Sequence, residues 1–183
     1  MTKVISVFGG SSPRAEDPAY KQAEKLGGLL AEQGFAVANG GYCGVMEAVS
    51  KGAAQAGGTV IGVTCTHLEA YRPIGPNPWI TREIRVERVS SRLQKLIEVG
   101  DGLVALPGGI GTLAEIVQSW SWLQTGEIEP KPLILVGSLW LEVFSLFQEQ
   151  AKEYLSFRDQ DLLEFVPDES AAAASLALRF LGE

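Results

Sequence analysis

A glycine-rich turn between a predicted strand and a predicted helix, at residues 103–115, most constrains the fold of this chain. The apolar run 103–106 predicts a buried strand, and Pro107 ends it because proline cannot donate to a sheet ladder. A helical pattern begins at Thr112. The intervening glycines allow positive φ and close approach of a ligand to the amides: Gly108, Gly109 and Gly111. Free N–H groups and the helix dipole at such a terminus favour an anion, so this segment predicts a phosphate site.

Two further glycine turns follow predicted strands at residues 3–8 and 35–38. Because parallel strands end at one edge of a sheet, all three turns are expected to converge on one ligand. The first turn also fits a plain turn with a helix cap. The expected phosphate-binding residues come from all three turns: Gly10, Ser11, Ser12, Gly40, Gly41, Gly108, Gly109, Gly111 and Thr112.

Predicted strands and helices alternate along the whole chain. The strands are expected at residues 3–8, 35–38, 59–64, 80–87, 103–106, 131–136 and 162–166, and the helices at 18–33, 45–56, 90–99, from 112, 139–154 and 168–180. Such alternation predicts an α/β fold: a Rossmann-like, doubly wound, mainly parallel sheet with helices on both faces, forming a single nucleotide-binding domain over residues 1–183. Alternating apolar and charged residues in 80–87 favour an edge strand.

The segment 65–79 is predicted to be a long loop that serves as a lid or pocket wall. Cys65 and His67 could share a metal ion, but no third ligand lies near them in sequence, so no metal site is expected.

Charge and composition exclude several functional classes. The net charge of −7 argues against a sequence-independent nucleic-acid surface, and no apolar run approaches the ~20 residues that span a bilayer. Because Met1 leads directly into a strand pattern, no signal peptide is expected. Two cysteines do not suggest a disulfide framework, and we therefore expect a cytoplasmic protein.

Two charged residues each allow two interpretations. The spacing of Thr112 and Glu115 fits a helix capping box, yet Glu115 also lies one turn from the predicted phosphate site, where a carboxylate can hold ribose hydroxyls or transfer a proton. Arg92, in the first turn of its helix, opposes the dipole at a cost of ~0.3–1 kcal/mol, which suggests an anionic partner, although a solvated surface arginine is the commoner case. Ser91 and Gln94 have the spacing of a second capping box.

At these positions the chain resembles the LOG (Lonely Guy) family of cytokinin-activating nucleoside 5′-monophosphate phosphoribohydrolases, often mislabelled as lysine decarboxylase. Residues 107–115 match its Pro-Gly-Gly-x-Gly-Thr-x-x-Glu signature, and the resemblance extends over about residues 3–137 through the segments 7–13, 40–46 and 58–63.

The resemblance implies that Glu115 is the catalytic glutamate and that Arg92, fifteen residues before the signature proline, is the catalytic arginine. Several residues depart from the family pattern. Val89, Ser90 and Leu93 replace the Met, His and Lys around Arg92, and further replacements are Ala114 for Glu, Asn39 for Gly and Glu47 for Gly. Molybdenum cofactor carrier proteins resemble the same family and bind a phosphorylated pterin without hydrolysing it.

The sequence therefore predicts a hydrolase that cleaves the N-glycosidic bond of a nucleoside 5′-monophosphate and uses no cofactor. The alternative is a non-catalytic carrier of a phosphorylated cofactor or nucleotide. The resemblance also implies a homodimer, to which Trp120 and Trp122 add an argument. They point ~200° apart on one helix, so one of them either covers a partner or packs under a neighbouring loop.

Overall fold

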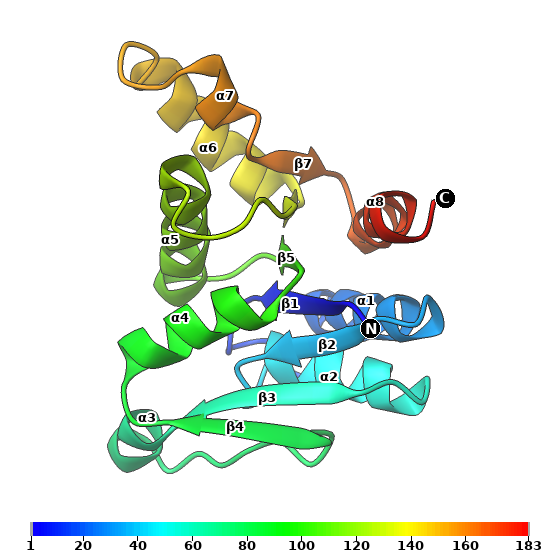
Figure 1. Ribbon diagram of the computed structural model, residues 1–183. Coiled ribbons are helices and arrows are strands. Elements are labelled where there is room, and N and C mark those ends of the chain that lie inside the picture. Colours follow the sequence, from blue (N-terminus) through cyan, green and yellow to red (C-terminus); the bar gives the residue numbers. More distant parts are fainter. Residues whose placement is uncertain (1, 183) are drawn as a thin grey trace.

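A seven-stranded, entirely parallel sheet in the order β4-β3-β2-β1-β5-β6-β7 forms the centre of the computed structural model, which describes residues 2–182 (Figure 1). This confirms the predicted doubly wound parallel sheet. The strands are β1 Val4–Phe8, β2 Ala36–Asn39, β3 Val60–Cys65, β4 Arg82–Val86, β5 Gly102–Ala105, β6 Leu133–Val136 and β7 Glu164–Val166.

Helices cover both faces of this sheet (Figure 1). One hydrophobic core joins the sheet to α1, α2 and α8, and a second joins its other face to α4, α5 and α6. The helices are α1 Pro18–Glu32, α2 Val45–Gln55, α3 Thr66–Tyr71, α4 Val89–Val99, α5 Ile110–Thr125, α6 Ser138–Gln150, α7 Phe157–Gln160 and α8 Glu169–Leu181.

The two-sided cover explains why the central strands are apolar at nearly every position. Along β5, Val104 faces the first core, while Leu103 and Ala105 face the second. The charged strand β4 lies at the edge of the sheet, as its alternating pattern predicted, and its Arg82 and Arg85 are exposed.

The direction of winding reverses between β1 and β5. The chain builds outward from β1 to β4 and then crosses back to place β5 on the other side of β1. Loops that leave these two strands diverge to opposite faces of the sheet, which opens a crevice at their carboxyl ends. The two loops also touch, because the Gly10 N–H donates a hydrogen bond of 3.2 Å to the Pro107 carbonyl. The first and third glycine turns are therefore fixed side by side.

Both predicted capping boxes are wrong. Helix α5 begins at Ile110 with Gly109 as its N-cap, so Thr112 lies inside the first turn and Glu115 is free of any capping bond. Helix α4 begins at Val89 after Arg88, again without a side-chain cap, and Ser91 lies within the helix.

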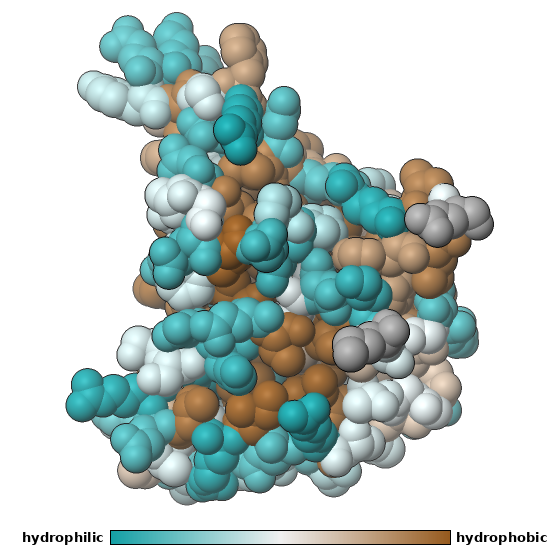
Figure 2. Space-filling view, viewed as in Figure 1, coloured by the Kyte–Doolittle hydropathy of each residue, from teal (hydrophilic) through white to brown (hydrophobic). Residues whose placement is uncertain are grey.

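Two short helices were not predicted. The segment 65–79 contains α3 rather than a continuous loop, and α7 follows α6. Four to six residues show too little of the 3.6-residue period for sequence analysis to detect them. The apolar surface on the face shown in Figure 2 is broken up by hydrophilic side chains. No helix within residues 2–182 is both long and apolar enough to cross a membrane.

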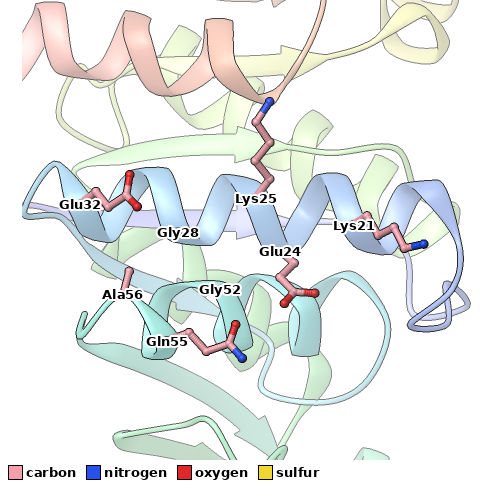
Figure 3. A pocket seen from close by; sticks show the side chains of 8 residues that line it. All are labelled: Lys21, Glu24, Lys25, Gly28, Glu32, Gly52, Gln55 and Ala56. Atoms are coloured by element: carbon pink, nitrogen blue, oxygen red, sulfur yellow. The ribbon is translucent and has the colours of Figure 1, made fainter.

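Helices α1 and α2 pack closely through glycines. A Cβ on Gly27 would lie 2.1 Å from the Val49 carbonyl oxygen, and one on Gly52 would lie 1.8 Å from that of Glu24. The groove between the helices has polar and charged walls (Figure 3). Lys25 reaches from it to α8, where its Nζ lies 2.7 Å from a carboxylate oxygen of Glu169. This ion pair thus connects α1 to α8.

Candidate active site

A cavity of about 320 Å³ lies at the carboxyl ends of β1 and β5. The structure gathers eight of the predicted site residues around it: Gly10, Ser11, Ser12, Arg92, Gly109, Gly111, Thr112 and Glu115. Gly40, Gly41 and Gly108 do not line it. The crevice predicted from the doubly wound topology is therefore a cavity with both charged side chains and glycine amides in its wall.

The N-terminus of α5 forms one wall. As in any helix, the amides of its first turn, at Ile110, Gly111 and Thr112, have no helical acceptor, and the first N–H bonded back to Gly109 is that of Leu113. A Cβ on Gly109 or Gly111 would meet no atom within 4 Å. These amides are consequently open to an anion, and the dipole of a 16-residue helix favours negative charge there.

Gly108 shapes this wall from behind. Its Cβ, if present, would lie 2.2 Å from the Thr112 Oγ1 and 2.8 Å from the Gly10 nitrogen. Only glycine therefore allows the first and third turns to approach each other this closely.

Arg92 also lines the cavity and is held by three groups. Its Nε donates a hydrogen bond of 2.8 Å to the Val63 carbonyl, its Nη2 lies 3.3 Å from the Met46 sulfur, and its Cζ lies 5.5 Å from the centroid of the Tyr42 ring. Burial lowers the pKa of the guanidinium, and the carboxylate of Glu115 opposes that shift. The arginine thus remains a cation in a largely desolvated position.

Glu115 projects into the same cavity from the second turn of α5. Within residues 2–182 its carboxylate has no hydrogen bond or ion pair. Burial raises its pKa to about 7, and the nearby Arg92 cation lowers it. A carboxyl group with this pKa exists in both protonation states near neutral pH, so it can accept or donate a proton there.

Residues that sequence analysis did not single out complete the cavity. Leu68, Arg72 and Ile74 confirm that the segment 65–79 forms a pocket wall. Tyr42 and Met46 come from the second glycine turn and the helix after it. Tyr42 could have been identified as a site residue because it is an aromatic residue inside a glycine turn. Nothing in the local sequence distinguishes Leu68 or Met46 from ordinary core residues. The apolar side chains give part of the cavity a nonpolar wall, which suits a flat aromatic group.

The described residues contain no set of ligands for a metal ion. Within residues 2–182, no three His, Cys, Asp or Glu side chains are grouped so that they could hold a metal ion.

The chain is similar to a known protein family and to several named relatives. A protein-family model described as "Possible lysine decarboxylase" matches residues 46–176. The chain is 30% identical over 136 residues to a cytokinin riboside 5′-monophosphate phosphoribohydrolase from Rhodococcoides fascians. It is 36% identical over 134 residues to a probable enzyme of the same name from Oryza sativa subsp. japonica. These matches cover 74% and 73% of this chain and 68% and 58% of the relatives, so part of each relative lies outside the comparison.

Among solved structures, the molybdenum cofactor carrier protein from Chlamydomonas reinhardtii has a TM-score of 0.76 and 28% identity, with 100% of both chains covered. A molybdenum cofactor binding protein from Rippkaea orientalis has the same TM-score at 22% identity, covering 100% of this chain and 99% of the other. The fold is therefore shared by hydrolases and by carriers.

Proposed function

This chain belongs to the protein family described as possible lysine decarboxylase, which includes the LOG phosphoribohydrolases, and from that premise we propose that it hydrolyses a nucleoside 5′-monophosphate. Water attacks C1′ of the ribose, the N-glycosidic bond breaks, and the products are the free base and ribose 5-phosphate. The observation that supports this most is that Glu115, Arg92 and the free amides of α5 all face one cavity.

The 5′-phosphate binds at the amides of residues 110–112, with the Gly10–Ser12 turn beside them. Phosphate binding fixes the ribose so that C1′ lies near Glu115. The reacting groups are then already oriented, which lowers the entropic cost of reaching the transition state. Gly40, Gly41 and Gly108 contribute to this site by shaping its walls.

Glu115 and Arg92 act on the reacting atoms. As C1′ gains positive charge in an oxocarbenium-like transition state, the ionised Glu115 stabilises it and takes the proton of the attacking water. The departing base gains electron density, which the Arg92 cation stabilises, and the base then takes up the proton that water gave to Glu115, so that it leaves neutral. Arg92 also increases the ionised fraction of Glu115, because it lowers the pKa of that carboxyl.

A carrier function is the second candidate, and the likeness to the Chlamydomonas reinhardtii carrier over the full length of both chains favours it. The same amides would then hold the phosphate of a larger cofactor, and Glu115 would have no reaction to catalyse.

A homodimer belongs to the same proposal. Trp120 is buried and its Nε1 donates to the Asp159 carbonyl at 2.6 Å, so this tryptophan packs under a neighbouring segment. Apolar residues beside it nevertheless stay partly exposed around a cavity of about 410 Å³, among them Leu113, Val117 and Val143. An exposed apolar face of this kind suits a second copy of the chain.

The single domain and the location are proposed on similar grounds. One continuous sheet links residues 4–166, which supports a single nucleotide-binding domain. Cys43 and Cys65 are free thiols, which supports a reducing, cytoplasmic environment.

The decisive experiment incubates the pure protein with a panel of nucleoside 5′-monophosphates and separates free base by chromatography. Release of a base together with equimolar ribose 5-phosphate supports the hydrolase. Binding of AMP with no base released over hours, at any pH from 5 to 9, overturns it in favour of the carrier.

A further inference from the structure

The second glycine turn faces the arginine rather than the cavity. A Cβ built on Gly40 would lie 1.5 Å from the Nη2 of Arg92 and 2.5 Å from the Met46 sulfur. The guanidinium therefore occupies the space in which any other residue at position 40 would place its side chain. Gly40 itself is absent from the lining of the cavity.

Four residues surround this guanidinium, and we call them the arginine slot: Gly40, Tyr42, Met46 and Val63. The Val63 carbonyl fixes the Nε–H direction, and the Tyr42 ring lies against the guanidinium. A hydrogen bond to a backbone carbonyl together with an aromatic face restricts both the position and the tilt of the planar group.

The slot is in turn held rigid from behind. The Tyr42 hydroxyl accepts a 2.6 Å hydrogen bond from the Cys65 N–H, and the Tyr42 carbonyl accepts one of 3.0 Å from the Asn77 Nδ2. Tyr42 is 2% exposed. Its ring is thus fixed to β3, and its backbone to the segment after α3, before any substrate binds.

From these contacts we propose that the second glycine turn positions Arg92 for catalysis, with Gly40 and Tyr42 as the positioning residues. The predicted effect on turnover rests on the proposed hydrolase function. The predicted effect on the position of the Arg92 guanidinium rests on the geometry alone. Arginine side chains have many rotamers, and the slot selects one that places the cation in the cavity wall, where it interacts with Glu115.

Gly40→Ala is the sharpest test, because the atoms that its Cβ would meet are the ends of two flexible side chains, which can move without disturbing the backbone. The fold is expected to survive while the guanidinium is displaced, and turnover of the best nucleotide is expected to fall ~10²-fold, the scale of a small misplacement of a reacting group. The matched control is Gly28→Ala, where the nearest atom lies at an ordinary 3.8 Å and activity should not change.

A spectroscopic readout separates the inference from the hydrolase proposal. The Arg92 Nε–H should give a slowly exchanging ¹H–¹⁵N signal, since it donates to a buried carbonyl. Gly40→Ala should lose this protection and Gly28→Ala should keep it, whether or not the protein hydrolyses any nucleotide. A Gly40→Ala protein that retains both the protected signal and wild-type turnover overturns the inference.

Two substitutions of Tyr42 test the proposed positioning of Arg92 independently. Tyr42→Leu removes the ring, while Tyr42→Phe keeps it, so Phe should preserve more turnover than Leu. The groups facing Arg92 are Glu115 from α5, Tyr42 from the turn and Cys65 from β3. Loosening the cation in Tyr42→Leu should therefore raise the apparent pKa of the Glu115 limb in the pH–rate profile. Equal losses in both variants with an unchanged profile would mean that Tyr42 only supports the fold.

Discussion

Glu115 and Arg92 line one cavity, and each shifts the pKa of the other toward its charged form. Burial acts in the opposite direction on both groups, raising the pKa of the carboxyl and lowering that of the guanidinium. The result is a carboxyl group with a pKa of about 7 beside a cation that stays charged. Two predictions follow from this opposition.

Glu115→Gln should lower turnover by 10²-fold or more, because the amide keeps the size of the side chain but cannot become a base. Since Glu115 forms no capping bond, the substitution should leave α5 intact. Steady-state base release measures the effect, with the exposed Glu142→Gln on α6 as the matched control. Unchanged turnover in Glu115→Gln would remove Glu115 from the mechanism.

The same carboxyl should make stability depend on pH. Its pKa rises from 4.5 to about 7 on folding, so the native state binds more protons than the unfolded state between these values. Stability therefore falls as pH rises through this window, and the loss is complete above about pH 7.

Melting curves of wild type and Glu115→Gln from pH 4.5 to 8 check this sign. The variant should gain in melting temperature relative to wild type as pH rises, because glutamine does not ionise. Asp101 does not interfere: burial raises its pKa, but the Val4 N–H and Lys3 lower it more, so its effect on stability falls below its ordinary value of 3.8 and outside this pH range. A constant difference across the range would show that Glu115 titrates normally.

Much of this site was predictable because its signals are local. A buried strand, a proline and three glycines specify the strand–turn–helix unit at residues 103–115, and alternation of such units specifies a parallel sheet. The boundary of α5 was not predictable from the same residues. Gly111 favours a late start, yet a first-turn residue needs no helical hydrogen bond through its own N–H, so the helix begins at Ile110.

Long-range contacts account for the rest. The position of Gly40 against Arg92 joins segments that are 52 residues apart, and the burial of Trp120 depends on the Asp159 carbonyl. Neither pairing leaves a periodic pattern in the sequence. In the sequence alone, Gly40 and Gly41 are therefore indistinguishable from the other turn glycines.

If the apolar face of α5 and α6 forms the dimer interface, a charged side chain placed there should weaken dimerisation. Val143→Asp places a carboxylate at a 41% exposed position beside the exposed cavity, where it should disfavour association without entering the core. Light scattering at micromolar concentration should give a dimer mass for wild type and a monomer mass for the variant. Leu178→Asp, at a 76% exposed position on α8, is the control and should stay dimeric. A monomeric wild type would contradict the proposed homodimer.

Asn39, which stands where the LOG pattern has glycine, tests how the arginine slot is supported. Its Oδ1 accepts a 2.8 Å hydrogen bond from the Gly41 N–H, and its Nδ2 donates one of 2.9 Å to the Ser50 Oγ, which itself donates to the Met46 carbonyl at 2.8 Å. Asn39 and Ser50 are fully buried, so no water replaces these partners. Although the family pattern suggests that glycine is acceptable here, Asn39→Gly should cost ~1–3 kcal/mol, the usual penalty for leaving a buried group unpaired.

For a chain of this length, that loss corresponds to a fall of roughly 2–12 °C in melting temperature. The double-mutant cycle with Ser50→Ala is the control. If the two side chains act through their shared hydrogen bond, the double variant should lose less stability than the sum of the losses in the two single variants. Because this network holds the turn that contains Gly40, Asn39→Gly should also weaken the protected Arg92 Nε–H signal, whereas Ser170→Ala on α8 should not. Additive losses with an unaltered Arg92 signal would separate Asn39 from the slot and leave it a role in stability alone.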